Sequence, residues 1–280
     1  MLIGKRTLKH RIISGLLIVG IVFFCLAPLY WMLVTSLQIP GTEFRLPVEL
    51  WPSEPSLESY GVVLNSPVTI QSAVVNSFVV SSLAMLGTLL LSSLAAFSIA
   101  RLRMKRKRLS FFVIQAAGLI PPIIVIAPTF VLIRMLGLLG TLWGLILPNI
   151  AYGVPLATLL IAGYFANVPF ELEDAARMDG ASPLRIFFQI MLPVALPGIF
   201  SAGVLSFLGS WGEFMTALTV SLGNPAARTV PVAVLSLSQA FELQWTWIGA
   251  ATMLSLVPVI VAVVLFQRLI IDGLTQGATR

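Results

Sequence analysis

The sequence predicts an all-α integral membrane protein, a bundle of six transmembrane helices. Apolar residues make up 58% of the 280 residues and charged residues only 10%, and the mean hydropathy is +0.99. This composition is typical of a chain whose solvent is mostly lipid. Six apolar stretches reach the roughly 20 residues that a helix needs to cross the hydrocarbon core, and none shows the strict alternation of barrel strands. These stretches are residues 12–37, 73–100, 109–133, 142–165, 196–222 and 247–271.

A single domain is expected to take up nearly the whole chain. The six helices form one transmembrane domain over residues 12–271, between short tails at 1–11 and 272–280. The longest connection between spans, residues 38–72, is rich in Pro, Glu and Ser and leaves no room for a separate soluble domain. The first span has the basic start of a secretory signal, but its apolar run is too long and no small-residue cleavage site follows, so we expect it to be retained.

Basic residues predict the orientation of the bundle. Cytoplasmic loops carry an excess of Lys and Arg, and basic clusters precede the first span and separate the second span from the third. We therefore expect both termini in the cytoplasm. The second cluster has no interleaved aromatic residue, which indicates topology and anionic lipid headgroups instead of nucleic-acid binding. The clusters are Lys5, Arg6, Lys9 and Arg11, and Arg101, Arg103, Lys105, Arg106, Lys107 and Arg108.

The chain contains few residues that could catalyse a reaction or bind a metal. The only histidine is His10, in the basic tail, and the only cysteine is Cys25, in the first span. A structural zinc site needs four clustered ligands, and a cysteine nucleophile needs a nearby base. The phosphate-binding pattern GxxxxGK[ST] is also absent from the sequence. We expect no catalytic residue, no metal site and no cofactor in this chain, so any nucleotide is hydrolysed by another chain.

The segment 166–195, between the fourth and fifth spans, predicts two short helices around a tight corner. Gly180 can adopt the positive φ that ends a helix, and Ser182 can cap the second helix. The other expected boundaries are Asn167 as the cap of the first helix, Pro169 near its start, Pro183 at the start of the second helix and Pro193 near its end.

The same segment carries an unusual charge for its expected side of the membrane. Four acidic residues stand against two arginines, whereas a helix pair that merely lies on the membrane surface would normally be basic. The simple alternative is such an interfacial helix pair, but the acidic charge favours a protein partner. The charged residues are Glu171, Glu173, Asp174, Asp179, Arg177 and Arg185.

Here the residues resemble a known family. The series Asp174-Ala175-Ala176, Asp179-Gly180-Ala181, Ile190 and Leu192-Pro193 resembles the EAA loop of ABC-importer membrane subunits. Further stretches, in order along the chain, are similar to the carbohydrate branch of that family, the permeases that resemble the smaller membrane subunit of the maltose transporter. These stretches are 28–37 (PLYWMLVTSL), 51–60 (WPSEPSLESY), Asn76-Ser77, 211–214 (WGEF) and 273–278 (GLTQGA).

The resemblance implies a type I ABC-importer permease fold, a place in the inner membrane of a bacterial cell, and a transport function without catalysis. The chain would form half of the translocation pathway of an ATP-driven, binding-protein-dependent sugar importer. Its partners would be a second permease subunit, two copies of a cytoplasmic ABC ATPase that bind ATP and Mg, and an extracytoplasmic solute-binding protein. The EAA loop would be the coupling helix that docks on the ATPase. The residues this assigns to coupling are Glu173, Asp174, Ala175, Ala176, Asp179, Gly180, Ala181 and Pro193, with Asp174 where the family usually has Glu.

Polar residues in the spans are candidates for the translocation path. Glu213 is the one acidic residue within a predicted span, and a carboxylate there requires a polar interior or a partner. It either meets sugar hydroxyls on the path or bonds within the bundle or to the second permease. The Pro121-Pro122 pair should break or kink the third span. The acidic 38–72 loop is expected to touch the binding protein. The other path candidates are Trp211, Asn149, Tyr152 and Gln115.

Three alternatives remain open at this stage. The first is an ABC importer permease for a solute that is not a sugar. The second, a secondary transporter, would need coupling-ion sites at the midplane and usually internal repeats. The third, an intramembrane enzyme, would need a nucleophile with a base or a metal cluster, and His10 lies outside the spans.

Overall fold

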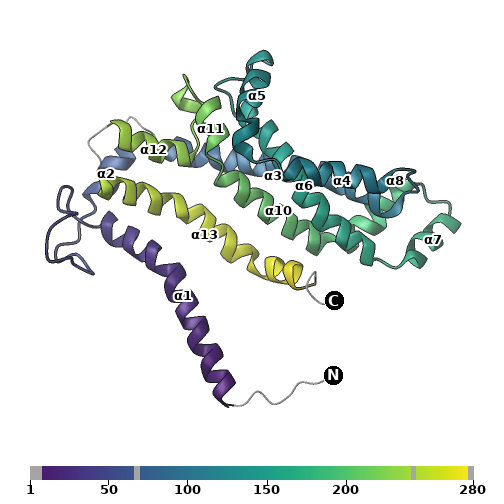
Figure 1. Cartoon of the computed structure of the whole chain (residues 1–280), viewed down its shortest axis with the longest axis horizontal. Coiled ribbons are helices and arrows are strands. Elements are labelled where there is room, and N and C mark those ends of the chain that lie inside the picture. The colour runs from purple at the N-terminus through teal and green to yellow at the C-terminus, as the bar shows by residue number, and fades with distance from the viewer. Residues whose placement is uncertain (1–7, 66–69, 241–243, 277–280) are drawn as a thin grey trace. The chain divides into compact units, whose positions relative to one another are not determined.

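The computed structural model of the chain describes residues 8–65, 70–240 and 244–276, and every regular element in these ranges is helical (Figure 1). This confirms the all-α prediction. Parts of the two expected tails, residues 1–7 and 277–280, lie outside the described residues. The chain forms two compact units, one from Met1–Thr69 with Val234–Val257 and the other from Ile70–Ala233 with Pro258–Arg280.

The first unit contains α1 (Leu8–Ser36), α2 (Glu58–Asn65) and the early part of α13 (Trp245–Gln276). The hydroxyl groups of Ser36 and Tyr60 are hydrogen-bonded at 2.8 Å, which ties the end of α1 to α2. A side-chain carbon at Gly249 would lie 3.1 Å from the backbone nitrogen of Ser36, so the missing side chain lets α13 approach α1 closely. Most of α1 nevertheless exposes its apolar side chains, as a lipid-facing helix does.

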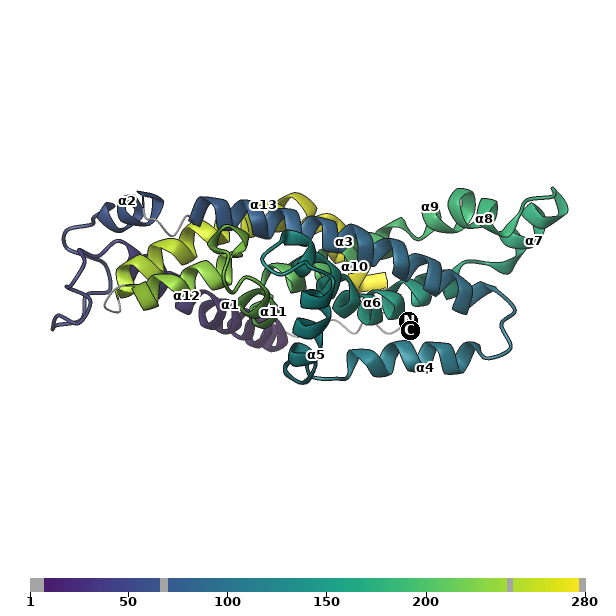
Figure 2. The same cartoon turned by 90° about the horizontal axis from the view of Figure 1, so that it is seen from above.

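Three helices form the centre of the second unit: α3 (Ile70–Arg101), α6 (Leu142–Asn167) and α10 (Leu196–Trp211). They lie side by side in both views (Figures 1 and 2). Small residues line their contacts: a side-chain carbon at Gly153 of α6 would lie 2.8 Å from Oγ1 of Thr88 on α3. Helices in lipid associate through such close packing, because lipid tails leave little hydrophobic driving force between them.

The third predicted span is broken, as the Pro121-Pro122 pair predicts. α4 (Lys107–Gly118) and α5 (Pro122–Met135) meet at an angle of 94°. Pro121 has the extended ψ of 132° and precedes the first residue of α5. Two consecutive prolines remove two backbone donors, so the helix cannot continue through them. The prediction of a break is confirmed.

The fifth predicted span, residues 196–222, is too long. α10 ends at Trp211, and a separate short helix, α11 (Met215–Val220), follows. The carboxylate of Glu213 accepts hydrogen bonds from the backbone nitrogens of Thr216 and Ala217, so it caps α11 instead of continuing α10. A 3₁₀ turn (Pro225–Ala227) and α12 (Val230–Ala240) then lead toward α13.

Four helices of the described chain are long and apolar enough to cross a membrane, and the number rises to six if each of two bent pairs is one span. The second bent pair joins Pro183–Val194 to Leu196–Trp211 at 79°. The number of crossings matches the six-helix prediction when each bent pair counts as one, but the second pair begins at Pro183, inside the segment 166–195 that was predicted to lie outside the membrane.

Candidate functional site

The segment between α6 and α10 has the predicted two-helix form at its corner. α7 (Phe170–Met178) is followed by α8 (Pro183–Ile186), a π-helical turn (Phe187–Met191) and α9 (Leu192–Val194). Gly180 has a φ of 78°, and the Ala181 nitrogen donates to the Ala176 oxygen at 2.9 Å. Ser182 Oγ accepts a hydrogen bond from the Arg185 nitrogen at 3.3 Å and caps α8. The predictions for Gly180 and Ser182 are confirmed.

The expected cap at Asn167 is wrong. α6 continues through Asn167, and the residue preceding α7 is Pro169, which makes no side-chain cap. The reason lies in the proline: a residue before proline is kept out of the helical region, and Val168 accordingly has an extended ψ of 129°. The turn between the helices is thus set by Val168 and Pro169.

The inner side of the segment is fixed in a hydrophobic core. Phe97 of α3, Phe165 of α6 and Phe187 are buried together, with ring centroids 5.2 to 6.3 Å apart. Ala176 and Ala181, two of the residues assigned to coupling, pack against this cluster. Their small side chains let α7 and the corner approach the core.

The other residues assigned to coupling divide into one buried side chain and an exposed set. Glu173 is only 3% exposed and points into the protein. The spacing of α7 places Leu172 on one face with Ala175 and Asp179, and Leu172 is exposed there. The sequence did not point to the last residue of α7, Met178, which is 88% exposed. The exposed members of the assigned set are Asp174, Ala175, Asp179, Gly180 and Pro193.

Glu173 belongs to a buried ion pair that the sequence did not predict. Its Oε1 accepts a hydrogen bond from Arg177 Nη2 at 2.6 Å, and its Oε2 lies 3.9 Å from Nη1 of Arg101, at the end of α3. The Arg101 side chain is fully buried. Its Nη2 also donates to the backbone oxygens of Phe165 and Val168, and the Phe170 ring stacks on its guanidinium at 4.2 Å.

A cavity of about 470 Å³ lies between α6, α10 and the start of α5. Three of the predicted path residues line it: Asn149, Tyr152 and Glu213. The other two do not. Gln115 donates to the Pro155 oxygen at 3.0 Å, and Trp211 is 8% exposed and stacked on Phe207.

Polar groups in this cavity are suited to binding hydroxyl groups. Glu213 Oε1 and Oε2 accept from the Thr216 and Ala217 nitrogens at 2.7 and 3.0 Å, so the carboxylate is held in place. The Tyr152 hydroxyl and the Ser210 hydroxyl are buried and make no hydrogen bond within the described residues. Both hydroxyls are closed off from solvent in this conformation, so the cavity wall must rearrange before either can donate to or accept from a solute hydroxyl.

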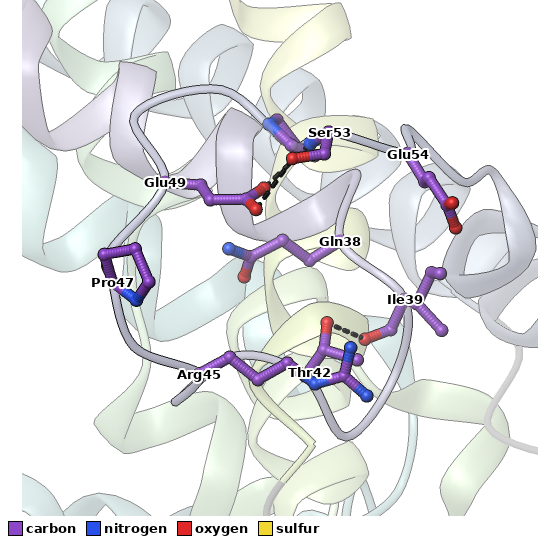
Figure 3. Close-up of a pocket in the computed structure, with 9 residues that line it drawn as sticks. Gln38, Ile39, Thr42, Arg45, Pro47, Glu49, Ser53 and Glu54 are labelled. Carbon is purple, nitrogen blue, oxygen red and sulfur yellow. Dashed lines mark hydrogen bonds between the residues drawn. The ribbon is translucent and has the colours of Figure 1, made fainter.

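A second, polar pocket of about 260 Å³ lies within the loop that follows α1 (Figure 3). Gln38 points into the ring that the loop forms, and Glu49 Oε1 and Oε2 accept from the Ser53 hydroxyl and nitrogen, both at 2.7 Å. The Ser53 hydroxyl, and then its backbone N–H, hold the pKa of Glu49 below its ordinary value. The loop returns to α1, where the Ser56 nitrogen donates to the Leu37 oxygen at 2.8 Å.

Residues 88–276 match the family described as binding-protein-dependent transport system inner membrane component. The chain is 34% identical to the sulfoquinovosyl glycerol transport system permease SmoH of Agrobacterium fabrum, over 91% of this chain and 89% of the relative. It is 34% identical to the trehalose/maltose transport system permease MalG of Thermococcus litoralis, over 95% and 96%.

A full-length relative and a solved structure agree with these matches. The trehalose transport system permease SugB of Mycobacterium tuberculosis is 32% identical over 99% of both chains. A chain from the structure of a bacterial ABC transporter involved in the import of the acidic polysaccharide alginate superimposes with a TM-score of 0.76, covering 96% of this chain and 99% of that chain at 21% identity. At that identity the superposition shows a shared fold.

Proposed function

The chain belongs to the binding-protein-dependent transport system inner membrane component family, and on this premise we propose that it is a permease subunit of an ATP-driven sugar importer. It is a multi-pass inner-membrane protein. The observation that carries the sugar assignment is the near full-length similarity to permeases named for trehalose, maltose and sulfoquinovosyl glycerol. All three solutes present several hydroxyl groups to a binding site.

The cavity between α6 and α10 supplies groups that fit such a solute. Tyr152 and Ser210 offer hydroxyls without partners among the described residues, and Asn149 adds an amide. The Glu213 carboxylate contributes acceptor lone pairs beyond the two backbone donors it already binds. This chain therefore provides one side of the path, and a second permease subunit provides the other.

Energy enters through the segment that contains α7 and α8. Its exposed surface combines the small residue Ala175 with Asp174, Asp179 and the apolar Met178, so a partner surface can approach closely and bury apolar area. The partner is a cytoplasmic ABC ATPase, present in two copies, which binds ATP and Mg. ATP-driven movement of the ATPase displaces α7, and the permease passes between inward-facing and outward-facing forms.

Topology follows from the basic clusters. The basic cluster from Lys5 to Arg11 and the stretch 101–108 are cytoplasmic, which puts both termini and the α7 segment on the ATPase side. The loop after α1 then faces outward, where it meets the extracytoplasmic solute-binding protein. Its exposed Phe44, Leu46 and Leu50 provide apolar contact area for that partner.

The test is purification of the tagged chain from its own host in mild detergent, with identification of the bound proteins. The eluate is reconstituted with the binding protein, and ATP hydrolysis and solute uptake are measured over a panel of disaccharides, glycosides, amino acids and oligopeptides. We expect an ATPase and a second permease to co-purify and only sugars to stimulate both activities. Stimulation by an amino acid or peptide alone would overturn the sugar assignment, and a stable complex without any ATPase would overturn the importer assignment.

A further inference from the structure

We propose that Arg101 is a positioning residue that fixes α7 to the end of α3, so that a displacement of α7 moves the α3–α6–α10 bundle. The inference rests on the proposed function for its consequence in transport. The fixation itself is a property of the chain's own contacts.

Arg101 joins three elements at one point. Its Nη2 donates to the oxygens of Phe165 and Val168, at the carboxyl end of α6 and in the turn that follows. The last carbonyl groups of a helix lack intrahelical donors and carry partial negative charge, so a buried guanidinium is well placed there. The end of α3 is thereby bound to the end of α6 and to the start of the α7 segment.

The same guanidinium holds α7 directly. The Phe170 ring, in the first turn of α7, stacks on it at 4.2 Å, and the carboxylate of Glu173, one turn further, lies 3.9 Å from Nη1. Arg177 holds that carboxylate from the other side at 2.6 Å. Arg101 and Glu173 are both removed from solvent, so salt screens their attraction less than that of a surface pair.

Little else attaches α7 to the bundle. Within the described residues, α7 packs extensively along no other helix, and both views show it at the end of the second unit (Figures 1 and 2). On its inner side, Ala176 also packs against the Phe165 and Phe187 cluster. A single methyl group resists sliding weakly, whereas Arg101 makes a ring contact and an ion pair with α7 that both break if α7 moves alone. Its two hydrogen bonds, to the oxygens of Phe165 and Val168, hold the guanidinium itself at the end of α6.

The first test measures how well ATP hydrolysis is coupled to transport. Wild type, Arg101→Gln, Arg101→Lys and the control Arg103→Gln are reconstituted as complete transporter complexes, and solute transported per ATP hydrolysed is measured. Arg103 lies two residues further along, is exposed, and lines a cleft together with Arg101, Phe170 and Glu173. Its replacement therefore removes an equal charge but leaves the contacts of Arg101 in place. We expect Arg101→Gln to lower the ratio by about fivefold or more, the low end of typical coupling between sites. The ratio for Arg101→Lys should lie between those of wild type and Arg101→Gln, and the ratio for Arg103→Gln should equal that of wild type.

A distance measurement tests the tie independently of any partner. Spin labels are attached at Met178→Cys on α7 and Leu94→Cys on α3, in a Cys25→Ser background, because both positions are exposed in the second unit. Arg101→Gln should broaden the distance distribution, and Arg103→Gln should leave it narrow. If Arg101→Gln does not accumulate in the membrane, Phe170→Leu removes the ring contact and keeps every charge.

The outcomes separate this inference from the proposed function. Unchanged distances and an unchanged transport ratio in the Arg101 and Phe170 variants would overturn the positioning role. Two results together would overturn the importer function but support the positioning role of Arg101. They are that the wild-type chain binds no ATPase, and that Arg101→Gln still broadens the distance distribution. If Arg101→Gln lowered the amount of assembled complex, ATP hydrolysis and uptake together, with solute transported per ATP unchanged, the role of Arg101 would be purely structural. That result would also count against the proposal.

Discussion

Gly153 offers the most direct test of the packing that forms the centre of the second unit. A methyl group at this position on α6 would lie 2.8 Å from Oγ1 and 2.9 Å from Cγ2 of Thr88, and 3.1 Å from Oγ of Ser206. Ordinary contact begins at 3.4 Å, so α3 or α6 must shift by about half an ångström. Thr88 is fully buried and cannot turn aside into open space.

The expected magnitude follows from a matched pair on one helix. Overpacking a core by one carbon typically costs about 1–3 kcal/mol, while replacing glycine by alanine within a helix gains about 1 kcal/mol in propensity. Gly163, also on α6, has nothing within 4 Å of the added carbon. Both variants gain the same helix propensity, so the difference between them reports the overpacking alone. The free energy of unfolding of Gly153→Ala should be lower than that of Gly163→Ala by about 1–3 kcal/mol.

The assay is reversible unfolding of each purified variant in mixed micelles with increasing SDS, followed by circular dichroism. Because Gly153 also lines the cavity, uptake is measured in parallel, and Gly153→Ala should transport more slowly than Gly163→Ala. Equal unfolding free energies for the two variants, within about 0.5 kcal/mol, would refute the close α3–α6 contact.

Three further predictions concern the candidate sites. Glu213→Ala should lose the cap of α11 and lower the free energy of unfolding by about 0.5–2 kcal/mol, whereas Glu213→Gln keeps one acceptor for the backbone N–H groups. Uptake by Glu213→Gln tests the role of the side chain. A change of sugar preference would place Glu213 on the path, and a change in coupling alone would assign it to the bundle. The hydrogen bonds from Ser53 hold the pKa of Glu49 below its ordinary value of 4.5. The ionised carboxylate therefore stabilises the loop fully above pH 4.5, and this stabilisation is lost as the pH falls through the pKa of Glu49 in the folded loop. Proteolysis of the 38–56 loop should therefore accelerate in acid, and Glu49→Gln should remove that dependence. Gly180→Trp should insert normally but uncouple hydrolysis from uptake, because φ is 78° there and the position is exposed on the proposed docking surface; undiminished uptake would count against docking at this corner.

Features of the fold that depend on one or two neighbouring residues were predictable. The break in the third span follows from the fixed φ and missing N–H groups of Pro121 and Pro122. The corner at Gly180 follows from the tolerance of glycine for positive φ. The cap of Ser182 follows from its position before Pro183. Each of these is decided within a turn of helix, so the local sequence suffices.

Errors arose where a distant or competing contact decides the outcome. An apolar count extends the fifth span to residue 222, but α10 ends at Trp211 because Glu213 folds forward to cap α11. The pairing of Arg101 with Glu173 could not be derived from sequence, since the two residues lie on separate helices with two spans between them. A partial signal existed: Arg101 directly ends an apolar span, where a buried arginine requires a partner.

The pairing changes what the run Glu173-Asp174-Ala175-Ala176 means. Successive residues of a helix point in different directions, so Glu173 and Ala176, three apart, face the bundle while Asp174 and Ala175 face outward. One short run thus supplies both inner contacts and an exposed outer face on a helix of nine residues, about 13 Å long, and the outer face is the surface that we propose docks on the ATPase. A partner that pushes on the outer face acts on the inner contacts across a single helix diameter, with little length over which α7 can bend. In the proposed mechanism, the exposed acidic face receives the push of the partner and the inner contacts of Arg101 pass it to the bundle, so both parts are needed to transmit motion.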